Sequence, residues 1–135
     1  MHGVRLLDAA GEVVRPCLLW NDTRAGAEAA AMDADPTFRA ISGTIVFPGF
    51  SAPKMAWVRD HEPDHWARTE RVLFPKDFLA YWLTGTLNCE PSDAAGSALF
   101  DPGKGDWSPA LCAAAGLSPD LLSPVIDSDS PRGPV

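Results

Sequence analysis

The sequence predicts a mixed α/β fold for its 135 residues. Two β-prone runs, Val4–Asp8 and Glu12–Trp20, flank a segment in which Asp8 and Gly11 favour a turn, so an antiparallel hairpin is expected at the start. Most of the remaining chain carries helix-start signals in which proline occupies the first turn. The length suffices for one hydrophobic core and not for two.

The helices are expected at positions set by capping residues, prolines and glycines. The Ala- and Glu-rich run Thr23–Met32 follows Asn21 and Asp22, either of which can cap a helix, and it ends near Asp35-Pro36. Further helices are expected over Pro36–Ala40, from Ser51 as N-cap to His61, from Pro63, over Pro75–Gly85 with a core-facing apolar side of Phe78, Leu79, Trp82 and Leu83, after Ser108 up to Gly116, and after Ser118. Strand-like runs are expected at Arg71–Phe74 and Ala98–Phe100, and the tail from Asp127 is expected to fray.

The amino-acid composition limits the classes of binding partner and the cellular location that are expected. The chain has 11 Lys and Arg against 18 Asp and Glu, a formal charge of -7, which disfavours binding to nucleic acid or to an anionic membrane. No signal-peptide pattern and no bilayer-length apolar run is seen, so a cytoplasmic location is expected. Cys17, Cys89 and Cys112 are odd in number and far apart, which predicts reduced thiols rather than disulfides or a zinc site.

The two ends of the predicted hairpin hold the candidate binding residues. Antiparallel pairing would bring His2 to the same edge as Trp20 and the polar residues that follow it. An imidazole exchanges hydrogen bonds with hydroxyls, and an indole offers a flat apolar face and an N–H donor, so the pair suits a small polyol. The plainer alternatives are a core aromatic for Trp20, and a helix cap with its solvated neighbour for Asp22 and Arg24.

Other polar residues give weaker signals. Lys54, Lys76 and Asp77 are expected at the surface, and Asp93 in a turn or cap. His61 and His65 are spaced as two ligands on one helix, but Pro63 intervenes and no third ligand is placed, so a metal site is disfavoured. No P-loop, GxGxxG or GxSxG motif occurs.

Seven blocks in order resemble a known family. They are Met1-His2-Gly3, Arg15–Arg24, Pro48–Lys54, Phe74–Phe78, Leu83-Thr84-Gly85, Ser92–Gly96 and Asp106-Trp107-Ser108. Together they are similar to the FGGY carbohydrate kinases, most closely to members that phosphorylate D-xylulose. The resemblance implies a ribonuclease-H-like (actin-like ATPase) N-terminal lobe with a mixed sheet and helices, of which residues 1–135 form part.

The same resemblance implies roles for residues and cofactors. Met1, His2 and Trp20 would contact an open-chain ketose, with Asn21, Asp22, Arg24 and Phe50 as neighbours. The complete enzyme would use ATP and Mg²⁺ to make D-xylulose 5-phosphate. The family's phosphate-binding hairpin would precede Met1 and its catalytic aspartate would follow the chain, so no catalytic residue is expected here.

Because this sequence contains neither the family's phosphate-binding hairpin nor its catalytic aspartate, two further expectations follow. The chain alone should be inactive, and loss of the leading strands should expose a sheet edge beside Val4, Leu6 and Leu18, which favours self-association or binding of the missing remainder. Three alternatives stay open: a related kinase for another polyol, a non-catalytic polyol-binding module, and an interaction domain.

Overall fold

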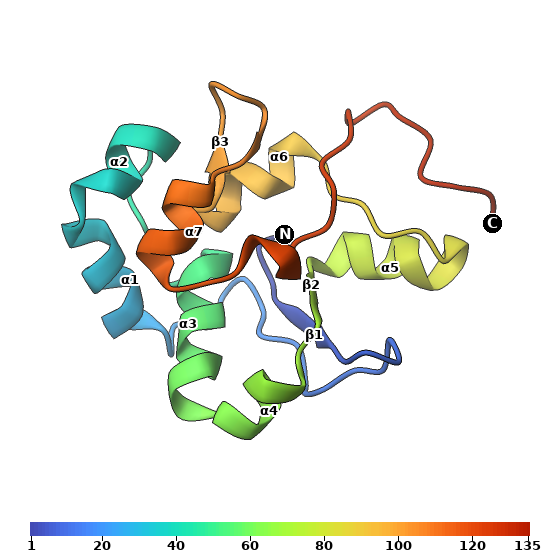
Figure 1. Cartoon of the computed structure of the whole chain (residues 1–135), viewed down its shortest axis with the longest axis horizontal. Helices are drawn as coiled ribbons and strands as arrows, with labels where there is room; N and C mark the ends of the chain where they lie inside the picture. Colours follow the sequence, from blue (N-terminus) through green and yellow to red (C-terminus); the bar gives the residue numbers. More distant parts are fainter.

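The structure is a computed structural model that describes residues 1–135. Its elements in chain order are β1 (Arg5–Leu7), α1 (Gly26–Ala34), α2 (Pro36–Ser42), α3 (Ser51–His61), α4 (Pro63–Arg68), β2 (Arg71–Leu73), α5 (Pro75–Thr84), α6 (Pro91–Ala94), the 3-10 turn η1 (Ala95–Ser97), β3 (Phe100–Asp101), β4 (Asp106–Trp107), α7 (Pro109–Ala115) and the 3-10 turn η2 (Pro119–Leu121). In Figure 1, α1 and α2 lie at one end, α5 and the C-terminal tail at the other, and β1 with β2 between them. The predicted mixture of strands and helices is confirmed, with the sheet reduced to short pairs.

The predicted hairpin forms, but its second arm is not a continuous strand. Asp8 Oδ1 accepts the backbone N–H groups of Ala10 and Glu12, which fixes the turn. Beyond the turn only isolated bridges join the arms, one of them between Val4 and Leu18. The continuous partner of β1 is β2, which pairs with it antiparallel from a site far along the chain.

The core contradicts the expectation of an exposed sheet edge. Val4, Leu6 and Leu18 are each only 1% exposed, because β1 has β2 on one side and the returning arm on the other. The core continues into α3, where Met55 and Val58 are fully buried and face the cluster formed with α1 and α7. These side chains are therefore shielded from solvent within this chain.

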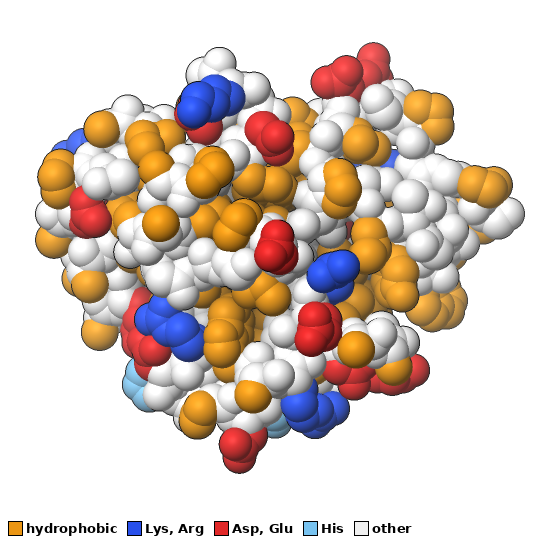
Figure 2. Space-filling view, viewed as in Figure 1, with side chains coloured by type: hydrophobic (Ala, Val, Ile, Leu, Met, Phe, Trp, Pro, Cys, Tyr) orange, Lys and Arg blue, Asp and Glu red, His pale blue; other side chains and the backbone are white.

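The apolar side of α5 is also different from the prediction. Leu79, Trp82 and Leu83 were expected in the core, but they are 55%, 73% and 44% exposed. No other element packs over this side of α5, which lies at the edge of the molecule (Figure 1) and contributes to the hydrophobic atoms seen at that end in Figure 2. The spacing predicted the helix correctly, but the helix has no partner there within this chain.

The helix starts follow the proline rule more closely than the capping rule. Five helices, α2, α4, α5, α6 and α7, begin with proline, and the Ser108 side chain accepts the N–H of Leu111 as predicted. Asn21 and Asp22 do not cap α1, which starts later, after Ala25, without a side-chain cap. Ser51 is likewise the first residue of α3 and not its N-cap, which is Phe50.

The thiols and the tail complete the comparison. All three cysteines are free, and burial raises the pKa of Cys112 to about 11. The segment after Asp127 has no helix or strand, yet Ser128 and Arg132 bond to Glu90 and Asp77, so its side chains are fastened to the body. None of the helices has the length and apolar character needed to cross a bilayer.

Candidate functional site

Two segments far apart in sequence, the N-terminal segment and residues 49–54, meet at the backbone of His2. The Lys54 ammonium, on α3, donates to the carbonyl oxygen of His2 at 3.0 Å and to that of Gly49 at 2.6 Å. The Ser51 hydroxyl donates to the same His2 oxygen at 3.3 Å. Lys54 was expected at the surface, but it is fully buried and joins the N-terminal segment to the loop before α3.

The imidazole of His2 packs against Gly96, where no side chain intervenes. A Cβ added at Gly96 would come within 1.8 Å of the ring, so the ring fits only because this position is glycine. Phe50 packs against the ring from another direction, with centroids 5.9 Å apart. The backbone of His2 has φ 49°, in the left-handed region that non-glycine residues rarely adopt, so the surrounding contacts must hold it.

Asp93, on α6, faces His2 at two atoms. Its Oδ1 accepts the backbone N–H of His2 at 3.1 Å and lies 3.2 Å from Nδ1 of the ring. Burial lowers the pKa of His2, and the neighbouring Asp93 carboxylate opposes this effect in part. Asp93 was expected in a turn or cap; it lies in the first turn of α6, and its side chain is buried.

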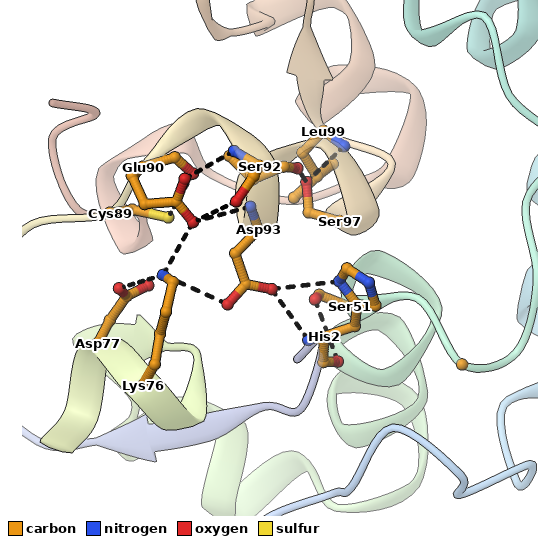
Figure 3. A network of polar contacts seen from close by, with 12 residues as sticks. His2, Ser51, Lys76, Asp77, Cys89, Glu90, Ser92, Asp93, Ser97 and Leu99 are labelled. Atoms are coloured by element: carbon orange, nitrogen blue, oxygen red, sulfur yellow. Dashed lines mark hydrogen bonds and ion pairs between the residues drawn. The ribbon is translucent and has the colours of Figure 1, made fainter. Parts of the chain in front are cut away.

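A single lysine links Asp93 to two further carboxylates. The Lys76 ammonium lies 2.6 Å from Asp77, 3.3 Å from Asp93 and 3.4 Å from Glu90 (Figure 3). Burial works against the charged form of Glu90, but hydrogen bonds from Ser92, Ser128 and nearby backbone N–H groups lower its pKa to about 2. Lys76 and Asp77 were expected at the surface, but Lys76 is half-buried and Asp77 almost fully buried.

Apolar side chains border His2 on the solvent side. Met1, Trp20 and Phe47 are largely exposed, Trp20 at 64%, and Phe47 meets Phe50 edge to face. Gly49 lies so close to Trp20 that an added Cβ would be 2.8 Å from the Trp20 carbonyl oxygen. The two arms of the hairpin are joined near their ends by the bridge between Val4 and Leu18, and Trp20 is an exposed aromatic rather than a core one.

The polar residues after Trp20 make no hydrogen bond or ion pair with His2. Asp22 pairs with Arg24, with Nη2 of the guanidinium 2.9 Å from the carboxylate, and this contact lowers the pKa of Asp22. The Arg24 guanidinium also lies 4.9 Å above the ring of Trp57. Asn21 is exposed and makes no side-chain hydrogen bond within the chain. Of the seven residues expected at a substrate, the structure brings the rings of His2 and Phe50 into contact, with Met1 next to His2 in sequence. The Trp20 carbonyl lies beside Gly49, and Asp22 and Arg24 pair with each other.

Sequence reasoning missed the residues that hold His2 in place, namely Ser51, Lys54, Lys76, Asp93 and Gly96. The available signal was that several of them lie in the family-like blocks Pro48–Lys54 and Ser92–Gly96. The surface cavities are elsewhere: the one of about 350 Å³ is lined by the hairpin turn, Tyr81 and Leu87, and none includes His2, Trp20 or Phe50. No cluster of three or more metal-ligating side chains occurs in the chain.

With this fold and site described, the class of protein follows from comparison. The chain belongs to the FGGY family of carbohydrate kinases, whose N-terminal domain matches residues 1–134. The solved relatives share its actin-like ATPase fold, which confirms the predicted fold class.

Xylulose kinases are among the relatives to which the chain is similar. The chain is 41% identical over 134 residues to the xylulose kinase of Escherichia coli K12, covering 98% of this chain and 28% of the relative. A solved xyloylose kinase from Brucella ovis is 52% identical with a TM-score of 0.90, covering 93% of this chain and 26% of that one. Plasmodium falciparum glycerol kinase with ADP has a TM-score of 0.87 at 19% identity, covers 98% of this chain and 28% of that one, and shows the fold alone. The chain thus spans little more than a quarter of the length of these relatives.

Proposed function

We propose that this chain forms part of the sugar-binding lobe of an ATP-dependent kinase that converts D-xylulose to D-xylulose 5-phosphate. The observation that carries the proposal is the contact between the rings of His2 and Phe50, with His2 held by a buried lysine and a buried aspartate. The exposed Trp20 is proposed to complete this surface. The xylulose kinase relatives support the choice of sugar, and their greater length supports placement in a longer protein.

The chemistry of the three residues fits a small polyol. A neutral imidazole accepts a hydrogen bond from a hydroxyl, and burial of His2 favours that neutral form. The exposed indole of Trp20 and the ring of Phe50 offer apolar faces for the C–H groups of an open-chain ketose. Met1 borders the same surface, and Asn21, Asp22 and Arg24 are proposed as outer neighbours that reach larger or distal hydroxyls.

The phosphoryl chemistry is assigned to the rest of the protein. ATP supplies the phosphoryl group, and Mg²⁺ neutralises charge on the phosphates. The clustered carboxylates of this chain, Asp77, Glu90 and Asp93, do not fit a Mg²⁺ site because each already lies beside the Lys76 ammonium. The chain therefore contributes substrate binding, and on its own it should not transfer phosphate.

A coupled assay for ADP formation tests this proposal. The complete kinase containing this sequence should turn over with D-xylulose at a higher kcat/KM than with D-ribulose, glycerol or D-gluconate, while the 135-residue chain alone should show no ketose-dependent signal. Higher kcat/KM with another polyol would reassign the substrate within the family. Binding of polyol without any turnover by the complete protein would instead make it a non-catalytic binding module.

A further inference from the structure

We propose that Asp93 is a positioning residue that fixes the His2 imidazole with its proton on Nδ1, leaving Nε2 to accept a hydroxyl of the sugar, and that Lys76 holds Asp93 in place for this purpose. The inference rests on the proposed role of His2 in sugar binding. It assigns a task to two side chains that do not themselves reach the substrate surface.

The first argument is the arrangement around Asp93 Oδ1. This oxygen accepts the His2 backbone N–H at 3.1 Å and faces Nδ1 at 3.2 Å. Nδ1 is buried and has no ideally aligned hydrogen-bond partner in the chain, so the Asp93 carboxylate is the group that compensates it. An unprotonated Nδ1 would direct its lone pair at the negatively charged carboxylate, so the neutral ring is expected to carry its proton on Nδ1. Long contacts of this kind are common in a site without substrate.

The second argument is the other carboxylate oxygen. Asp93 Oδ2 is buried, and the Lys76 ammonium lies 3.3 Å from it. The carboxylate therefore accepts the backbone N–H of His2 on one side and forms an ion pair with Lys76 on the other (Figure 3). An asparagine of the same shape has one acceptor and one donor, so it can satisfy only one side.

The third argument concerns the remaining surroundings of the ring. The ring packs against Gly96 on one side and against the ring of Phe50 on another, so it has little freedom to rotate. The positive charge of Lys54, on α3, lowers the pKa of the ring in addition to burial and so favours the neutral form. Nε2 makes no hydrogen bond within the chain, which leaves its lone pair for a ligand.

The tautomer can be measured directly in the complete kinase. Long-range ¹H–¹⁵N correlation spectra of ¹⁵N-histidine protein distinguish the two neutral forms, with His2→Ala identifying the resonances of His2. The wild type should show the Nδ1–H form at neutral pH, and Asp93→Asn should shift the population towards Nε2–H. A wild-type ring protonated on Nε2 would overturn the proposal without recourse to any variant.

Kinetics supply the second readout. Asp93→Asn should raise the KM for the ketose about tenfold, leave the KM for ATP unchanged, and lose little kcat; Lys76→Met should act in the same direction. The controls are Asp129→Asn and Lys104→Met, which alter exposed residues of the same types, and they should behave as wild type. An unchanged ketose KM in Asp93→Asn, together with a raised one in His2→Ala, would refute the positioning role alone. An unchanged ketose KM in His2→Ala would refute the proposed function itself.

Discussion

Replacing Gly96 by alanine tests the geometry around His2 with a single methyl group. The added Cβ would lie 1.8 Å from Cε1 and 2.0 Å from Nδ1 of the imidazole, whereas ordinary contacts begin at 3.4 Å. The ring must therefore move by about 1.6 Å, which is enough to break its alignment with Asp93 and with a bound hydroxyl. Because the ring is the end of a side chain, this movement is easier than a shift of buried backbone.

The expected effect is on the substrate and not on the fold. A lost hydrogen bond of about 0.5–1.5 kcal/mol lowers kcat/KM for the ketose about two- to thirteen-fold. Initial rates of the complete kinase at varied ketose and varied ATP measure this, with a thermal melt to confirm folding. Gly26→Ala is the matched control, because a Cβ there meets nothing within 4 Å and alanine favours the helix. An unchanged ketose kcat/KM in Gly96→Ala would refute the geometry described for His2.

Three further predictions concern stability and association. Burial lowers the pKa of Lys54 from 10.5 to about 8, so the unfolded chain binds more protons than the folded chain between these pH values. The free energy of unfolding of the wild type, relative to that of Lys54→Met, should therefore rise by about 1–3 kcal/mol as the pH increases from 8 to 10.5. Urea titrations that show no change in this difference with pH would contradict the prediction. Hydrogen bonds hold the pKa of Glu90 at about 2 against 4.5 unperturbed, so Glu90→Gln should destabilise the chain at neutral pH and progressively less as the pH falls from 4.5 towards 2, and a difference that persists at pH 2 would count against this. The exposed Leu79, Trp82 and Leu83 of α5 should make the isolated chain self-associate in light-scattering chromatography, and Trp82→Glu should shift it towards monomer; a wild-type chain that is monomeric at high concentration would remove this surface as a cause.

The sequence predicted those parts of the fold that depend on neighbouring residues. The turn at Asp8 and the proline-led helices appeared as expected, because their causes lie within a few positions of one another. The exposure of Trp82 was not predictable, since helical spacing shows that an apolar side exists and not what covers it. Similarly, β1 was assigned the returning arm as partner, whereas β2 pairs with it from more distant sequence.

In the candidate site too, features set by nearby residues were predictable and features set by distant residues were not. Strand pairing correctly predicted that the two arms meet near Val4 and Leu18, which lie two residues from His2 and Trp20. The supports of His2 were not predictable because Asp93 lies 91 positions and Lys54 52 positions away from it. Charged residues at helix starts are common at surfaces, so their types alone gave no sign of burial.

The most direct test of the central claim compares His2→Ala and Trp20→Ala with the wild-type complete kinase in a coupled ADP-forming assay. Each variant should lower kcat/KM for D-xylulose by an amount that corresponds to about 0.5–1.5 kcal/mol or more, while the KM for ATP stays at the wild-type value. Such a split would show that the edge formed by these two residues binds the sugar. Equal losses for sugar and nucleotide, or no loss for either, would contradict the account.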